Sequence, residues 1–156
     1  MVATFRVDNM QFNVRRVNWE QDGNGVRTLR TNVFVYEQGV PIDLEWDQFD
    51  DAAIHAVARS DTAVVGTGRL IIDSTTSARI GRMAVGATYR RDGVGSAILA
   101  FLEDEARTLG ITRITLHAQN YVKDFYARHG YSEHGEMFME AGILHIEMQK
   151  GLSGSH

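Results

Sequence analysis

A glycine- and arginine-rich loop between an apolar strand and an amphipathic helix constrains this chain more than any other feature. Residues 82–96 read RMAVGATYRRDGVGS. The apolar residues that follow recur at helical spacing: Val94, Ile98, Leu102, Ala106 and Leu109. This pattern predicts a helix from about Gly93 to Leu109, closed by Gly110. The loop therefore opens on a helix N-terminus, where free backbone N–H groups and the positive dipole end favour a phosphate.

The glycine spacing distinguishes this loop from two common nucleotide-binding loops. A P-loop requires Gly-x-x-x-x-Gly-Lys-Ser/Thr and a dinucleotide fold requires Gly-x-Gly-x-x-Gly, and the chain has neither pattern here. The pattern present is Arg90-x-x-Gly93-x-Gly95. Gly93 and Gly95 lack side chains that would hold a diphosphate away from the backbone. An ordinary glycine-containing turn between a strand and a helix would fit the same residues.

Length and composition predict one globular domain. The chain has 156 residues, of which 44% are hydrophobic and 23% charged, so we expect a single domain over 1–150 and a flexible tail over 151–156. A net charge of −4 argues against nucleic acid or an anionic membrane as a partner. The absence of cysteine excludes disulfides, thiolate zinc sites and a cysteine nucleophile. No apolar run is long enough to span a membrane, and we expect a cytoplasmic protein.

The apolar periodicity predicts an α/β fold with a mixed sheet. Helices are expected at about 25–38, 93–109 and 121–129, and residues 41–52 form an acidic loop with at most one helical turn. The expected strands include a short one at Phe5 and Val7, followed by 11–18, 54–59, 63–72, 79–85, 114–119, 131–139 and 143–149. The strand–helix–strand order over 79–119 implies one central parallel crossover, whereas the other pairs are antiparallel.

A second motif lies downstream, where residues 116–131 read LHAQNYVKDFYARHGY. Together the two motifs resemble the GNAT (GCN5-related N-acetyltransferase) family, which has Gln/Arg-x-x-Gly-x-Gly/Ala after a strand and a later segment ending in Phe-Tyr-x-x-x-Gly-Phe. The resemblance implies the GNAT acyl-CoA N-acyltransferase fold, with strands 79–85 and 114–119 splayed apart. It also implies that acetyl-CoA binds with its pantetheine arm in the gap.

Two further stretches resemble the ElaA-like branch of the GNAT family. Residues 33–41 read VFVYEQGVP and are followed by Glu45, Asp47, Asp51 and His55, and residues 142–148 read GILHIEM. The resemblances together cover about residues 28–150. They indicate the acceptor side of the site rather than a particular substrate.

The family resemblance implies a set of residues that bind acetyl-CoA. These are Met83, Ala84, Val85, Arg90, Arg91, Asp92, Gly93, Val94, Gly95, Ser96, Gln119, Asn120, Phe125 and Tyr126. Tyr126 takes the place of the tyrosine that faces the CoA sulfur, where a protonated phenol can donate to the leaving thiolate. Packing beneath the last hairpin is the alternative role for Tyr126. Gln119 stands where the family often has Asn, so its neighbour Asn120 could make that contact instead.

Transfer to an amine also requires a group that removes a proton, because an amine with a pKa of about 10 is mostly ammonium at pH 7. The candidates for this base are Glu37, Glu45, His55 and His145, and Glu37 is assigned a catalytic role beside Tyr126. The expected substrate-binding residues are Glu37, Gln38, Glu45, His55 and His145. Each histidine, like His117, could instead be a hydrogen-bonded wall residue. No His-x-x-x-His spacing indicates a metal site.

The sequence therefore predicts an N-acetyltransferase that transfers the acetyl group of acetyl-CoA to a primary amine of a small molecule or peptide. A non-catalytic acyl-CoA-binding or regulatory module is the alternative. The sequence leaves open whether the chain forms a homodimer. The acidic residues Glu37, Glu45, Asp47, Asp50 and Asp51 are expected either to favour a cationic acceptor or to form an ordinary solvated loop.

Overall fold

Eight strands form one mixed sheet in the computed structural model, which describes residues 2–7 and 10–152. The strand order is β1-β2-β3-β4-β5-β6-β8-β7. Only β5 and β6 pair in parallel among these strands, as predicted. The bounds are β1 (Val2–Val7), β2 (Met10–Arg16), β3 (Ile54–Ser60), β4 (Ala63–Ile72), β5 (Ser77–Val85), β6 (Arg113–Gln119), β7 (Ser132–Glu140) and β8 (Ile143–Gly151).

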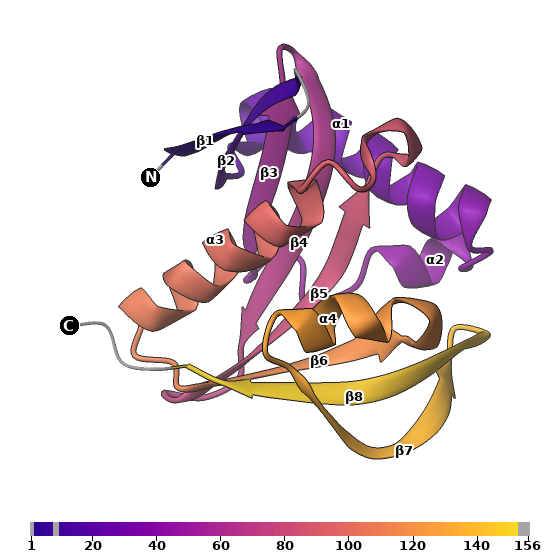
Figure 1. Ribbon diagram of the computed structural model, residues 1–156. Coiled ribbons are helices and arrows are strands. Elements are labelled where there is room, and N and C mark those ends of the chain that lie inside the picture. Colours follow the sequence, from indigo (N-terminus) through magenta and orange to yellow (C-terminus); the bar gives the residue numbers. More distant parts are fainter. Residues whose placement is uncertain (1, 8–9, 153–156) are drawn as a thin grey trace.

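Helices cover both faces of the sheet (Figure 1). On one face α3 (Val94–Thr108) packs against β3, β4 and β5, and its residues Ile98 and Leu102 are fully buried. On the other face lie α1 (Trp19–Arg30), its π-helical continuation η1 (Thr31–Glu37) and the single turn α2 (Ile42–Glu45). The remaining helical segments are η2 (Ala87–Tyr89), η3 (Asn120–Val122) and α4 (Lys123–Arg128).

The prediction that the first helix begins near Gly25 was wrong, because α1 begins at Trp19. Asn18 caps this helix, and its side-chain oxygen accepts a hydrogen bond of 3.0 Å from the backbone of Glu20. The sequence suggested Gly25 as the start of the helix, but this glycine lies inside α1, where the packing of the helix on the sheet explains it. A Cβ on Gly25 would lie only 2.6 Å from Cγ2 of Val64 on β4, so the close approach of helix and sheet requires glycine here.

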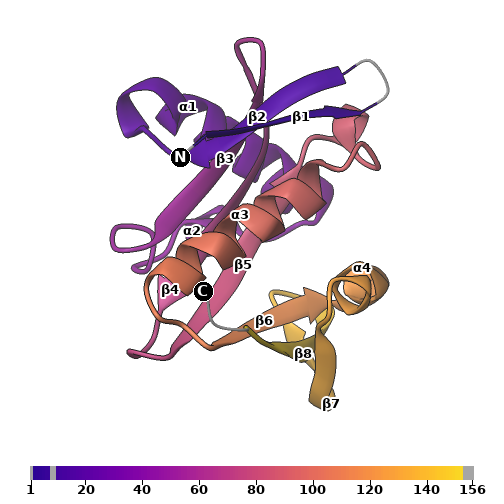
Figure 2. The same cartoon turned by 60° about the vertical axis from the view of Figure 1, so that its left-hand side comes forward.

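The β5 and β6 strands separate partway along their length, as the family resemblance implied. They pair only from Ser77–Arg113 to Arg79–Thr115. Beyond Arg79, the backbone of β5 up to Val85 has β4 on one side and no paired strand among the described residues on the other. Figure 2 shows β6, β8 and β7 diverging from the rest of the sheet. The strand β5 borders this gap, and along the chain it is followed by η2 and then by α3.

A β-bulge shapes β5 at the start of this gap. Three residue steps on β5, from Gly81 to Ala84, lie opposite two steps on β4, from Thr67 to Arg69. The extra residue is Arg82, whose φ of 51° is the left-handed conformation that most side chains avoid. The bulge turns Arg82 out of the strand alternation and toward the α2 side of the sheet.

The end of the chain differs in part from the expected flexible tail. Gly151 belongs to β8, and Leu152 is 6% exposed in the core, where its backbone donates to Thr112. Residues 153–156 of the predicted tail lie outside the described residues. No helix in the described ranges is both long and apolar enough to cross a membrane.

Candidate active site

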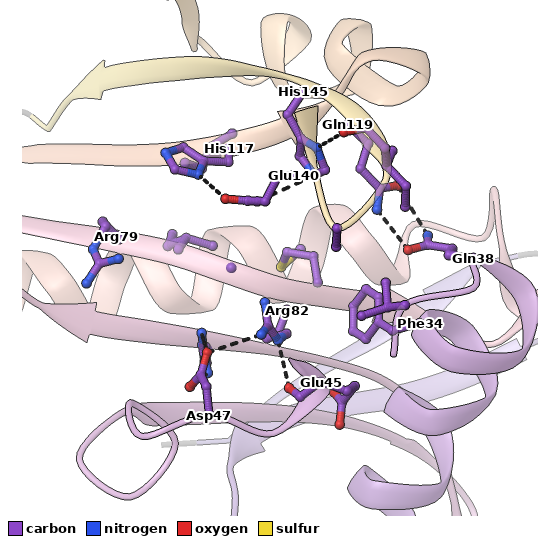
Figure 3. Close-up of a pocket in the computed structure, with 18 of the residues that line it drawn as sticks. Phe34, Gln38, Glu45, Asp47, Arg79, Arg82, His117, Gln119, Glu140 and His145 are labelled. Atoms are coloured by element: carbon purple, nitrogen blue, oxygen red, sulfur yellow. Dashed lines mark hydrogen bonds and ion pairs between the residues drawn. The ribbon is translucent and has the colours of Figure 1, made fainter. Parts of the chain in front are cut away.

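A cavity of about 450 Å³ lies on the α1 and α2 side of the sheet, where β5 and β6 part (Figure 3). Its walls come from segments far apart in the sequence: η1, α2 and its following loop, β4, β5, β6, α4 and the β7–β8 hairpin. Apolar side chains alternate with charged ones along these walls. Of the predicted residues, six line the cavity: Gln38, Glu45, Met83, Gln119, Tyr126 and His145.

Tyr126 lies on α4 against the apolar part of the cavity. Its side chain is buried and its ring contacts Phe125 and Tyr131 edge to face. Its hydroxyl makes no hydrogen bond to any described residue, whereas the Tyr131 hydroxyl donates to Glu103 over 2.7 Å. Burial, with a smaller contribution from Tyr121, raises the pKa of Tyr126 well above its usual value. Tyr126 is therefore a protonated donor with a free hydroxyl, and Tyr131 has the packing role.

The N-terminus of α3 retains free donors that could bind an anion. Gly93 caps the helix with a φ of 83°, no side chain caps the first turn, and that turn contains no acidic residue. A Cβ at Gly95 would lie 3.4 Å from Phe125, so a larger side chain would fill the space between α3 and α4. Val94 is buried against β4 and supports the turn from inside.

The predicted phosphate-binding loop is held by contacts on both sides. The Arg90 guanidinium donates to the backbone oxygen of Val85 over 3.0 Å and to both carboxylate oxygens of Glu37 over 2.9 Å. Arg91 is exposed in a left-handed conformation and Asp92 is partly buried. Glu37 does not line the cavity, so its position favours a role in holding Arg90 rather than the predicted catalytic one.

The other predicted acetyl-CoA residues lie on β5, at the end of β6, on α3 and on α4. Ala84 packs in the cluster with Leu29, Val33 and Phe34 of the first helix, so its backbone rather than its side chain is available. Ser96 shares a hydrogen bond of 2.9 Å with His129.

The two amides at the end of β6 have different environments. Gln119 and Gln38 exchange two hydrogen bonds of 2.8 and 3.2 Å, which join β6 to the end of η1 across the cavity (Figure 3). The side-chain oxygen of Asn120 is buried and has no hydrogen-bond partner in the described structure. The Asn120 oxygen is therefore an unpaired buried acceptor, whereas Gln119 already has its partner.

The acidic loop after α2 is neither a free acidic rim nor a solvated loop. Glu45 and Asp50 bind the buried Arg30, and Asp47 and Asp50 bind the buried Arg69. Burial alone would raise the pKa of Asp50, but its hydrogen bonds with Arg30, the Asp47 backbone and Arg69 outweigh this and lower it. Arginine neutralises Glu45, Asp47 and Asp50, whereas Asp51 is exposed and has no ion pair among the described residues, so most of the predicted acidic charge is used within the protein.

Arg82 connects this loop to the bulge in β5. Its guanidinium donates to the backbone oxygens of Leu44 and Glu45 and to the carboxylate of Asp47, each over 3.1 Å (Figure 3). The left-handed backbone at Arg82 directs the side chain to these three acceptors. The strand that borders the gap and the loop that walls the cavity are therefore fixed by the same residue.

The two predicted acceptor-side histidines have different positions. His55 is buried beneath Trp19, is hydrogen-bonded to the Asp50 backbone over 2.9 Å, and does not line the cavity. Burial lowers the pKa of His55, and its hydrogen bond with Asp50 opposes this only partly. His145 lines the cavity from β8. The structure therefore places His145 at the cavity and His55 in the interior.

Sequence reasoning missed Glu140, which lies at the end of β7 and faces both His117 and His145 across the cavity wall (Figure 3). A hydrogen bond from His117 lowers the pKa of Glu140, and the same bond raises the pKa of His117. The register of the β7–β8 hairpin, which pairs Glu140 with Ile143 and Phe138 with His145, could have placed Glu140 beside the histidines.

A mixed sheet that opens beside a glycine-rich helix start, with a buried tyrosine at the opening, defines an acyltransferase of the acyl-CoA type. Comparison with known proteins agrees, because the profile of the acetyltransferase (GNAT) domain matches residues 21–152. The chain therefore belongs to the GNAT family of acetyltransferases and is an acyltransferase enzyme.

Individual relatives support this assignment. YjcF of Bacillus subtilis (strain 168), an uncharacterized N-acetyltransferase, is 35% identical over 123 residues, which are 78% of this chain and 87% of YjcF. An acyl-CoA N-acyltransferase from Pseudomonas aeruginosa has a similar structure, with a TM-score of 0.77 and 26% identity over 90% of this chain and 99% of that one. Escherichia coli ElaA shares the fold with a TM-score of 0.76 and 24% identity over 90% of this chain and 99% of ElaA.

Proposed function

We propose that this acyltransferase transfers the acetyl group of acetyl-CoA to a primary amine of a small molecule or peptide by direct attack on the thioester. The observation that carries the proposal is the unpaired edge of β5, which ends beside the free hydroxyl of Tyr126 in a cavity open to a second substrate. Family membership favours an enzyme over a non-catalytic CoA-binding module.

The described residues fit acetyl-CoA at three places. The α3 N-terminus at Gly93 and Gly95, with Arg90 beside it, would hold the diphosphate. The backbone of β5 from Met83 to Val85 would pair with the pantetheine arm as an added strand would. The free side-chain oxygen of Asn120 would accept an N–H from the same arm.

The chain's own groups suit the two charge changes of acyl transfer. When bound, acetyl-CoA supplies an activated acetyl group. Backbone N–H groups on the free edge of β5 would hold the carbonyl oxygen as it gains negative charge. The Tyr126 hydroxyl would donate its proton to the departing sulfur, because no described residue competes for that hydrogen bond. The apolar side chains of Met83, Leu116 and Val122 around Tyr126 would limit access of water to the thioester.

Release of CoA over a panel of amines tests the proposal. The panel should include phenethylamine, spermidine, glucosamine and a peptide with a free N-terminus, each with acetyl-CoA and each against a reaction without amine. We expect at least one amine to raise CoA release and to yield an acetylated product by mass spectrometry. Binding of acetyl-CoA without amine-dependent release in a broad panel would contradict the proposed amine acceptor.

A further inference from the structure

Alternating histidines and glutamates form a row on the cavity face of β6, β8 and β7. The row begins at His145 and continues through Glu140, His117 and Glu147 to His134. Cross-strand pairing holds it together, because His117 lies opposite Glu147 and Glu147 lies opposite His134. The side chain of His145 is 7% exposed and that of His134 is 66% exposed, so the row leads from the cavity to solvent.

The ring of His145 is oriented so that Nε2 can accept a proton. Nδ1 donates to the backbone oxygen of Ile143 over 2.7 Å, which fixes the neutral tautomer with its lone pair on Nε2. Nε2 lies 3.7 Å from Oε2 of Glu140, close enough to stabilise a proton that arrives there. Phe138 stacks on His145 and contacts His117 edge-on, which restricts both rings.

Distances along the rest of the row suit a proton path. Oε1 of Glu140 lies 3.0 Å from Nδ1 of His117, and Nε2 of His117 lies 3.9 Å from Oε1 of Glu147. Oε2 of Glu147 lies 3.2 Å from Nδ1 of His134 and also accepts from Gln149. The pairs Glu140–His117 and Glu147–His134 are close enough to share a proton directly, whereas the steps of 3.7 Å from His145 to Glu140 and 3.9 Å from His117 to Glu147 each require a small side-chain movement.

Charged groups on β5 face the row from across the cavity. Arg82 lies near enough to favour the ionised form of Glu140, and Arg79 opposes a proton on His117. Glu140 and Glu147 favour that proton more strongly, so the net effect on the pKa of His117 is upward. Glu140 is the charged group that faces His145 directly, since the neighbouring Gln38 and Gln119 carry no charge.

We propose that His145 Nε2 is the general base of the transfer and that Glu140, His117, Glu147 and His134 carry the proton to solvent. This inference rests on the proposed amine acceptor. His145 takes one proton from the ammonium group. The neutral nitrogen then bonds to the acetyl carbon as the carbon–sulfur bond breaks, and Tyr126 protonates the sulfur. The second nitrogen proton restores Tyr126, so each turnover releases one proton, which leaves along the row.

The test uses two amines of the same shape that differ in basicity, phenethylamine and its β,β-difluoro analogue. Fluorine lowers the ammonium pKa, so more of the analogue is already neutral at pH 7 and requires less help from a base. At pH 7, His145→Gln should lower kcat/KM for phenethylamine about 100-fold, within the range of general base catalysis. The loss for the difluoro analogue should be below about 5-fold.

The pH profile provides a second readout of the same base. In His145→Gln, kcat/KM for phenethylamine should rise about tenfold per pH unit toward the ammonium pKa, because only neutral amine reacts. The intact enzyme should depend on pH much less steeply near neutrality. Added imidazole should restore part of the activity of His145→Ala, since a free base can occupy the vacated space.

Glu140→Gln isolates the relay, because it removes the charge beside Nε2 on an exposed side chain. We expect about a 10-fold loss of kcat with an unchanged KM for acetyl-CoA. Glu136→Gln makes the same change on the same strand outside the row and should leave activity unchanged. A thermal shift with acetyl-CoA shows whether each variant still folds and binds its donor.

These experiments distinguish a failure of His145 as the base, or of the relay, from a failure of the proposed amine acceptor. Equal losses for both amines in His145→Gln, or a loss without any change in pH dependence, would overturn His145 as base and leave it a positioning residue. Full activity of Glu140→Gln would overturn the relay. If no amine in the panel is acetylated by the intact enzyme, the amine acceptor itself fails, and with it the proton that the relay is proposed to carry.

Discussion

The two faces of the sheet beside the gap between β5 and β6 are built in opposite ways. On the α3 side, the predicted contacts come from one stretch of chain, with open backbone groups at Gly93 and an exposed Arg90. On the acceptor side, α2 and the loop after it are bound by buried ion pairs through Arg30 and Arg69 and by a partly exposed one through Arg82. The first side leaves the backbone N–H groups of the α3 N-terminus uncapped by any side chain and pairs Arg90 with Glu37 near the surface, whereas the second uses most of its charges in ion pairs within the protein.

This difference indicates where specificity can arise. A side whose buried carboxylates Glu45 and Asp50, and the neighbouring Asp47, are paired with arginines has less free charge to attract an acceptor. Under the proposed function, discrimination there would depend on the shape of the cavity and on the polar groups that line it, above all His145 and Glu140. Under the proposed function, the donor side would instead bind the part of acetyl-CoA that carries most of its charge, a task that suits the positive end of the α3 dipole.

The largest effect should come from breaking the buried ion pairs with Arg69→Met. The substitution leaves Asp47 and Asp50 with one cation fewer in a buried site, which typically costs about 3 to 5 kcal/mol. Chemical denaturation measures this loss. Arg79→Met is the matched control, because Arg79 pairs with Asp73 at the surface and should cost less than about 1 kcal/mol. Similar losses in both variants would contradict a special role for the buried pairs.

The same ion pairs should make the free energy of unfolding decrease at low pH. The folded-state pKa values of Asp47 and Asp50 lie below the ordinary value, since their arginine partners outweigh the effect of burial. Their contribution is therefore complete above the unfolded pKa of about 4 and is lost as the pH falls through the lower folded values. Unfolding followed from pH 6 to pH 2 should show this decline, and Arg69→Met should show less of it.

A smaller effect is expected on the donor side from Gly95→Val. Acetyl-CoA at 100 times its dissociation constant should stabilise the intact protein by about 2.7 kcal/mol. Valine would project toward Phe125 and fill the space in front of the α3 N-terminus, so the thermal shift with acetyl-CoA should largely disappear. Ala100→Val adds the same side chain to an exposed position of α3 and should keep the shift. An unchanged shift in Gly95→Val would remove the diphosphate site from α3.

Tyr126→Phe should affect the rate and leave binding nearly intact. A hydrogen bond to a charged group contributes about 1.5 to 3 kcal/mol, so kcat should fall roughly 10- to 150-fold. The ring contacts with Phe125 and Tyr131 remain, and the KM for acetyl-CoA should change little. Undiminished turnover at saturating substrates would mean that Tyr126 only packs.

The smallest effect should come from Glu37→Gln. The side chains of Glu37 and Arg90 are 40% and 43% exposed, and ion pairs this close to solvent contribute about 0 to 1 kcal/mol to stability. We expect kcat to change less than about 3-fold, because Glu37 lies outside the cavity. A loss of kcat near 100-fold would restore Glu37 as the base and weaken the case for His145.

How much the sequence could predict follows the same division. The α3 helix, its glycine loop and Tyr126 were recognisable because each is marked by residues close together in the chain. The start of α1 was not, because Gly25 is explained only by Val64 on a strand far downstream. Glu140 was missed for a similar reason, since its partner His117 lies 23 positions earlier and meets it only through strand register.

The ion pairs of the acceptor side show the same limit. Arg30 looks like an ordinary charged residue near the end of a helix, and nothing local indicates that it is 1% exposed. Its partners Glu45 and Asp50 lie 15 and 20 positions away in a segment that reads as an acidic loop. The sequence shows the acidic residues of this segment but not which arginines pair with them in the fold.

The bulge at Arg82 limits how this enzyme could be re-engineered. A designer who exchanges residues 41–52 for a loop from another acyltransferase, to change the acceptor, would remove the three acceptors that Arg82 requires. The freed arginine would lie in the strand that also borders the donor gap. The smallest unit that can be exchanged is therefore the loop together with Arg30, Arg69 and Arg82, because these arginines pair with its carboxylates.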